Sequence, residues 1–136
     1  MLVLASASPR RRALLEPFCS FDIRPADLDE DPHPGEDPRR YVERLAIEKA
    51  ATVAAGTGAG AVVLAADTTV DLDGAILAKP LDGPDAARML QLLSGRPHLV
   101  HTGVAVGDEA FVVSTEVVFV ELSAAMIEWY LATGEP

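Results

Sequence analysis

The sequence predicts an α/β fold, a mixed twisted sheet flanked by helices, from three observations. Short apolar runs typical of strands alternate with segments that carry helix start and stop signals. The run at 61–66 is apolar throughout, which is typical of a central strand buried on both faces. The chain has 136 residues, of which 49% are hydrophobic and 24% are charged. That length suffices for one domain of this class and is too short for two.

The first elements are short. Residues 2–5 form an apolar run that predicts a buried strand. Pro9 suits the first turn of a helix, which runs through Leu15 and must stop at Pro17. Residues 21–23 predict a second strand.

A loop and a longer helix come next. Residues 27–37 are acidic, contain prolines and glycine, and show no apolar period, so they predict a loop. Asp37-Pro38 supplies a capping carboxylate and a first-turn proline for a helix that continues to Ala55. The strand at 61–66 then runs directly into Asp67, and we expect it to deliver that acid to the end of the sheet.

The second half predicts a hairpin, two long strands and two helices. Asp73-Gly74 supplies the two positive φ angles of a type I′ turn between strands. The elements expected in order are strands at 69–72 and 75–77, a helix at 84–93, strands at 99–106 and 110–121, and a helix capped by Ser123 that turns Met126, Ile127, Tyr130 and Leu131 toward the core.

Charge and hydropathy exclude several classes of protein. The net charge of −10 argues against a general nucleic-acid binder, because a phosphate polymer would be repelled by the average surface. No apolar run approaches the ~20 residues that cross a bilayer. The first residues lack the basic start of a signal peptide, so the expected location is cytoplasmic. The single cysteine, Cys19, can form neither an internal disulfide nor a zinc site.

The positive charge is concentrated near the amino terminus. Ser6, Ser8, Arg10 and Arg11 lie where the first predicted strand passes into a helix. Free backbone N–H groups at a helix start, hydroxyl donors and guanidinium groups together favour binding of an anion such as phosphate. A solvated arginine cluster that caps a short helix would have the same sequence.

Lys49 lies on the core stripe of its predicted helix. It follows Leu45 by four residues and Val42 by seven, so it points with the apolar positions. Such a lysine either extends to solvent or faces a cleft that holds an anionic partner, because burial of an unpaired ammonium is costly. We favour the interpretation in which Lys49 faces a cleft.

Acidic residues provide candidates for a metal site or a general base. Asp67 follows a strand that is too apolar for an acid there to be an ordinary surface residue, which favours a metal-binding or base role. The alternative role is an Asx turn at the start of the hairpin. Asp27, Asp29 and Glu30 lie in the preceding loop, and oxygen-rich loops bind Mg²⁺ together with substrate phosphates. Taken alone, such an acidic run is usually solvated.

Five segments together resemble the Maf family of nucleoside triphosphate pyrophosphatases, first described as inhibitors of septum formation. They are L-A-S-A-S-P-R-R, R-L-A-I-E-K-A, A-D-T-T-V, D-G-A-I-L-A-K-P and L-S-G-R-P-H-L-V-H-T-G-V, and the match runs from Leu4 to the terminal T-G-E-P. The resemblance implies a Maf/ITPase-like fold and cleavage between the α and β phosphates of a nucleotide, with Mg²⁺ or Mn²⁺ required. It also suggests a homodimer.

The resemblance assigns roles residue by residue. Asp67 matches the catalytic aspartate that accepts a proton from the attacking water, and Glu30 matches the acid that helps to hold the metal. The substrate-binding positions that it implies are Ser8, Arg10, Arg11, Lys49, Thr68 and Lys79.

Thr68 after Asp67 implies the branch that acts on dTTP and UTP, because the 7-methyl-GTP branch usually carries glutamine there. Ala78 replaces the glycine of the family's G-K-P. Family members continue past T-G-E-P into a D-K-A-G-A-Y-G-I-Q-G segment that these 136 residues lack, so we expect a single domain, 1–136, truncated at its C-terminal end. The alternatives are a 7-methyl-GTP pyrophosphatase and a noncatalytic nucleotide-binding regulator of septum formation.

Overall fold

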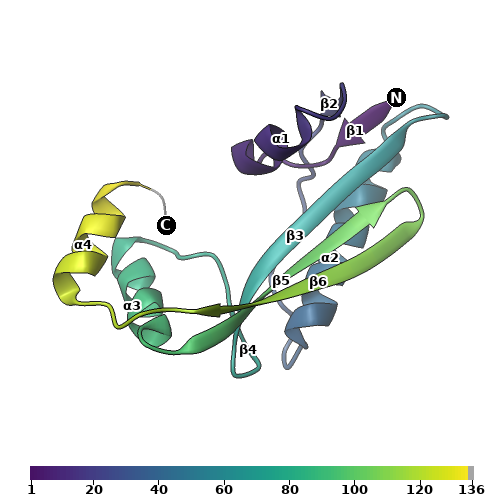
Figure 1. The fold of residues 1–136 in the computed structure, drawn as a ribbon. Helices are drawn as coiled ribbons and strands as arrows, with labels where there is room; N and C mark the ends of the chain where they lie inside the picture. The colour runs from purple at the N-terminus through teal and green to yellow at the C-terminus, as the bar shows by residue number, and fades with distance from the viewer. Residues whose placement is uncertain (135–136) are drawn as a thin grey trace.

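The computed structural model describes residues 1–134. Figure 1 shows a long twisted sheet with helices packed against it and at its two ends. The elements in chain order are β1 (Leu2–Leu4), α1 (Pro9–Leu15), β2 (Asp22–Ile23), α2 (Pro38–Ala54), β3 (Val62–Leu72), β4 (Ala75–Leu77), α3 (Gly83–Leu93), β5 (Pro97–Val106), β6 (Glu109–Val118) and α4 (Ala124–Ala132). Their order agrees with the sequence prediction, except that the two strands expected at 61–66 and 69–72 form the single strand β3.

The sheet mixes parallel and antiparallel pairs in the order β2-β1-β3-β5-β6, with β4 paired to β3. β1 pairs in parallel with both β2 and β3, whereas β3, β5 and β6 form an antiparallel meander. The β3–β4 turn has positive φ at both Asp73 and Gly74. The predicted mixed sheet and its Asp-Gly hairpin are therefore confirmed.

Helix α2 packs against one face of the sheet (Figure 1). The shared core is made largely of small side chains, among them Ala46, Ala65 and Ala105, so helix and sheet lie close together. Gly103 marks a close approach, because a Cβ built there would lie 2.3 Å from the carbonyl oxygen of Val42. A side chain at residue 103 would push α2 off the sheet.

The prediction that a strand ends at Asp67 is wrong. Asp67 lies in the middle of the eleven-residue β3, whose antiparallel register with β5 runs without a break from Leu64 to Asp71. The parallel partner β1, however, pairs only as far as Leu64. Asp67 therefore lies past the carboxyl end of β1 and not past the end of its own strand.

The predictions for the C-terminal region are partly wrong. Strand β6 stops at Val118, three residues short of the expected end. In α4 only Ile127 is buried, while Met126 and Tyr130 are 46% and 37% exposed. These side chains face an open pocket beside α3 and not a closed core. The final Glu-Pro of the T-G-E-P match, residues 135–136, lies outside the described residues.

Among residues 1–134, no helix is long and apolar enough to cross a membrane.

Candidate active site

Lys49 joins two carboxylates that are distant in the sequence. Its Nζ lies 2.9 Å from Oε1 of Glu30 and 3.0 Å from Oδ1 of Asp67. The side chains of Lys49 and Asp67 are each only 11% exposed. The predicted anionic partner of this core-facing lysine is thus a pair of carboxylates, contributed by the acidic loop and by β3.

The loop that carries Glu30 is fixed by α2. Tyr41 lies eight residues before Lys49, on the same side of the helix. Its phenol donates a hydrogen bond of 2.5 Å to the backbone carbonyl of Glu30. Burial, together with the nearby charges of Asp67 and Glu30, raises the pKa of Tyr41 to about 12. The phenol therefore keeps its proton, and can donate it, throughout the neutral range.

Burial also shifts the pKa of Asp67. Loss of hydration raises the pKa of its carboxyl above the usual value, and the hydrogen bond and positive charge of Lys49 offset part of that rise. A carboxylate that is more basic than usual, but still held next to a cation, is suited to accept a proton from water.

Helix α1 contacts β3 through Arg11. Arg11 donates from Nη1 to the carbonyl oxygen of Ala66 at 3.0 Å and from Nη2 to Oγ1 of Thr68 at 3.2 Å. Ala66 lies on an edge of β3 that pairs with β1 up to Leu64 and with β4 from Val70. Within residues 1–134 no strand pairs with the stretch between them, and Arg11 covers part of it.

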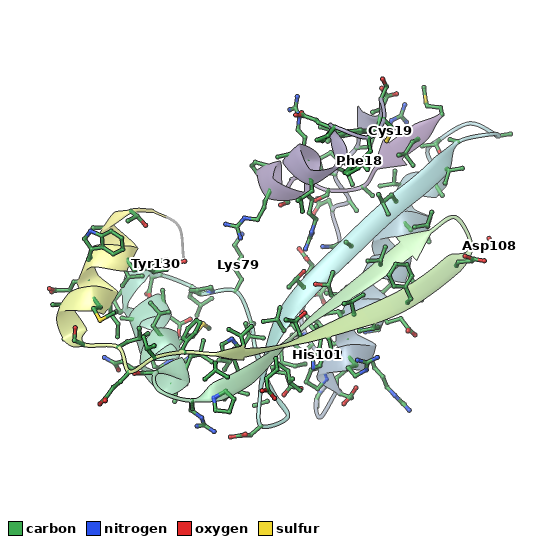
Figure 2. The ribbon with its side chains drawn as sticks, in the orientation of Figure 1. Phe18, Cys19, Lys79, His101, Asp108 and Tyr130 are labelled. Atoms are coloured by element: carbon green, nitrogen blue, oxygen red, sulfur yellow. The ribbon has the colours of Figure 1, made fainter. Side chains whose placement is uncertain are left out.

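A cleft of about 910 Å³ wraps this free edge. Successive residues of a strand point to opposite faces, and the free edge allows both Asp67 and Thr68 to line one space. Figure 2 shows Lys79 on the connection between β4 and α3, across from α1. Six of the predicted site residues line the cleft: Arg11, Glu30, Lys49, Asp67, Thr68 and Lys79.

Two predicted phosphate ligands lie outside the cleft. The hydroxyl of Ser8 caps α1 and accepts from the backbone N–H of Arg11 at 3.3 Å. Arg10 is exposed. Helix α1 has only seven residues, and the Ser8 hydroxyl stabilises its start as an N-cap.

The acidic loop contributes less than its composition suggested. Asp27 and Asp29 are exposed, and Asp29 accepts a hydrogen bond from the backbone N–H of Asp31, as in an Asx turn. No group of three or more histidine, cysteine or acidic residues within 1–134 is arranged to hold a metal ion. Of the loop acids singled out, only Glu30 joins Asp67.

Two further residues line the cleft: Tyr41, which sequence reasoning missed, and His98, which it interpreted as structural. The spacing of Tyr41, Leu45 and Lys49 by four residues was a usable signal for the tyrosine. His98 is buried on β5, packs edge-to-face on Phe119 with ring centroids 4.9 Å apart, and has a lowered pKa because of burial. Its reading as a structural histidine agrees with this packing.

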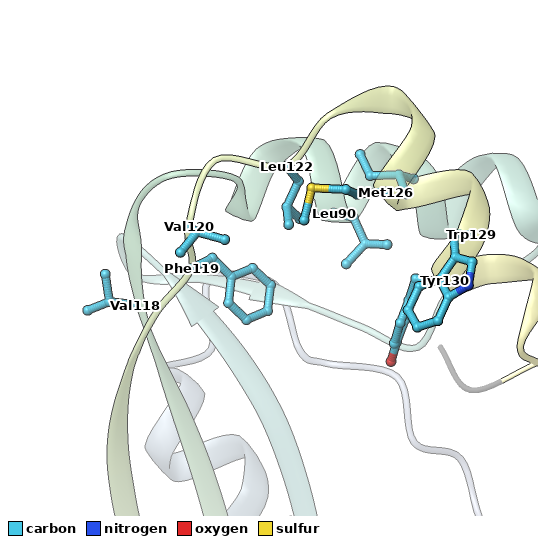
Figure 3. A pocket seen from close by; sticks show the side chains of 9 residues that line it. Leu90, Val118, Phe119, Val120, Leu122, Met126, Trp129 and Tyr130 are labelled. Carbon is cyan, nitrogen blue, oxygen red and sulfur yellow. The ribbon is translucent and has the colours of Figure 1, made fainter.

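A second pocket, of about 480 Å³, lies between the end of β6, α3 and α4 (Figure 3). Phe119, Met126 and Trp129 are among the hydrophobic residues that line it. Trp129 is 71% exposed. This pocket has no charged lining residue to neutralise a triphosphate. The first cleft is therefore the candidate active site.

The mixed sheet, and a cleft that holds paired carboxylates together with Lys49, Arg11 and Lys79, define an α/β protein whose site suits a polyphosphate and a divalent metal. The description "Maf-like protein" is that of a family model that matches residues 1–136. The chain belongs to the Maf family.

Close relatives carry one name. The chain is 54% identical over 144 residues to a "dTTP/UTP pyrophosphatase" of Anaeromyxobacter dehalogenans (strain 2CP-C), with 99% of this chain and 72% of the relative covered. It is 52% identical to a protein of the same name from Myxococcus xanthus (strain DK1622), with 100% and 71% covered. In fold it resembles the Staphylococcus aureus Ham1 protein, with a TM-score of 0.56 at 16% identity, over 85% of this chain and 69% of that one.

Proposed function

We propose that this chain hydrolyses dTTP and UTP between the α and β phosphates, releasing the nucleoside monophosphate and pyrophosphate, and that it thereby removes unwanted pyrimidine nucleotides. The observation that carries the proposal is the position of Lys49 between Glu30 and Asp67 at 2.9 and 3.0 Å, inside a cleft large enough for a nucleotide. The relatives named as dTTP/UTP pyrophosphatases support the choice of substrate.

The carboxylates of Glu30 and Asp67 fit a magnesium or manganese ion. Both bond the same ammonium group, so these two oxygens lie within about 6 Å of each other, and both are the hard donors that Mg²⁺ prefers. Mg²⁺ typically takes one or two protein carboxylates and completes its shell with water and substrate phosphates. When bound, such an ion would neutralise charge on the phosphates.

The remaining chemistry belongs to the side chains. Asp67, with its pKa raised by burial, orients the attacking water and takes its proton. Lys49 and Lys79 compensate the negative charge that develops on the phosphates as the bond breaks. Arg11 extends this positive region on the α1 side, the Ser8 hydroxyl and the exposed Arg10 at the start of the same helix are proposed as further phosphate contacts, and Thr68 faces the nucleotide.

The test is pyrophosphate release by the purified chain with Mg²⁺, measured separately with dTTP, UTP and 7-methyl-GTP. Release from the two pyrimidine nucleotides is expected. Asp67→Asn should lower kcat by about 10²- to 10⁴-fold, the range that a general base contributes, with nucleotide binding kept. Asp73→Asn is the matched control, because that carboxylate is 74% exposed in the β3–β4 turn.

The other outcomes are equally informative. Binding without release from the unsubstituted chain would favour a noncatalytic regulator. Release from 7-methyl-GTP alone would place the chain in the other branch. The homodimer, the cytoplasmic location and the extent of the domain stay predictions.

A further inference from the structure

Thr102 lies on β5 and is not a lining residue of the cleft, but it is hydrogen bonded to Thr68, which is. The two threonines are directly paired in the β3–β5 register, and their Oγ1 atoms lie 3.0 Å apart. Thr102 is half-buried, whereas Thr68 is exposed to the cleft. Thr102 can therefore act on a ligand only by controlling the Thr68 hydroxyl.

The number of donor and acceptor sites on the Thr68 hydroxyl determines how Thr102 can orient it. A hydroxyl has one hydrogen to donate and two lone pairs to accept with. Arg11 can only donate, and it occupies one lone pair of Thr68 at 3.2 Å. If Thr102 donates to the second lone pair, Thr68 has no acceptor capacity left, and its own hydrogen is free for a ligand.

We propose that Thr102 is a positioning residue that donates to Thr68 and so fixes the Thr68 hydroxyl as a hydrogen-bond donor toward the C4 carbonyl of a uracil or thymine base. This inference rests on the proposed pyrimidine substrates. A cytosine base has an amino group at C4, itself a donor, and gains nothing from a donor at Thr68. The threonine pair thus selects a keto base over an amino base.

The test compares the binding of two nonhydrolysable nucleotides, α,β-methylene-UTP and α,β-methylene-CTP, with Mg²⁺ present. Thr102→Val keeps the shape of the side chain and removes the donor, so Thr68 can turn its acceptor to the cleft. Affinity for the uridine compound should fall by about 3- to 10-fold, the equivalent of one hydrogen bond, with no loss for the cytidine compound. Thr102→Ser should restore the original ratio of the two dissociation constants.

Thr115→Val is the matched control, because it makes the same substitution on the neighbouring strand. Thr115 pairs with Val100, two residues from Thr102, and therefore lies on the same face of the sheet. The control should leave both dissociation constants unchanged. An equal change of both constants in Thr102→Val, or no change in either, overturns the inference.

Failure of the proposed function is a different result. It appears as absence of pyrophosphate release, whereas the role of Thr102 is measured by binding alone. A chain that binds the uridine compound selectively without cleaving UTP would refute the hydrolase and keep the threonine pair.

Discussion

Replacement of Gly103 by alanine should disturb the active site from beneath α2. The new Cβ would lie 2.3 Å from the carbonyl oxygen and 2.4 Å from the carbonyl carbon of Val42, and 2.7 Å from the backbone nitrogen of Glu43. All three atoms belong to the backbone of α2, so no side chain can rotate away to relieve the clash. The helix must recede by about 1 Å to restore ordinary contact distances.

The expected cost follows from this displacement. Overpacking of a close interface costs about 1–3 kcal/mol, which for a chain of this size lowers the melting temperature by about 3–15 °C. Lys49 lies two helical turns beyond Val42 and would move away from Asp67. A misplacement of about 1 Å can lower kcat/KM by about 10²-fold even when the protein remains folded.

The assay combines thermal unfolding with pyrophosphate release from dTTP. Gly83→Ala is the control, because nothing lies within 4 Å of the added Cβ and Gly83 has no positive φ. It should change neither quantity appreciably. If Gly103→Ala melts and turns over like the unsubstituted chain, the close approach of α2 does not set the site geometry, and this reasoning is refuted.

Three further predictions concern pH, the acidic loop and the metal. Hydrogen bonds from Arg44 lower the pKa of Glu36 to about 2, so the stability that this pair contributes is present above the unfolded value of 4.5 and is lost as pH falls toward 2. Glu36→Gln should flatten that part of the stability curve, measured as urea midpoints across this range. Tyr41→Phe removes the bond to the Glu30 carbonyl and should raise the Mg²⁺ concentration needed for half-maximal activity by about 3- to 10-fold. An unchanged Mg²⁺ requirement would mean that Tyr41 does not position Glu30. Removal of divalent metal by EDTA should abolish pyrophosphate release, and added Mg²⁺ should restore it; activity that persists in EDTA would exclude a metal role for Glu30 and Asp67.

The sequence correctly predicted that the Lys49 side chain points with the apolar face of its helix, because helical periodicity is a local property. Its spacing from Leu45 and Val42 shows which way the side chain points, whatever lies opposite. The identity of the partners is nonlocal, however. Glu30 is nineteen residues before Lys49 and Asp67 eighteen after it, and only the packing of α2 against the sheet brings all three together.

The errors have a common cause in strand pairing. Residues 61–66 look like a complete buried strand because their apolar run stops at Asp67. The strand continues because β5 supplies hydrogen-bond partners as far as Asp71, and the sequence around residue 67 carries no sign of a partner thirty-six residues downstream. The assignment of Ser8 as a phosphate ligand stays a prediction, since a hydroxyl at a helix start fits a phosphate and a cap equally well.

By itself, the sequence determined the alternation of strands and helices, the Asp-Gly hairpin and the family, because these depend on short-range patterns of residues. Only the tertiary structure decided that Asp67 lies past the end of β1, that Arg11 reaches β3, and that Thr102 pairs with Thr68. Those relations depend on the register between strands and on the approach of α2 over Gly103, which form only when the whole sheet is assembled.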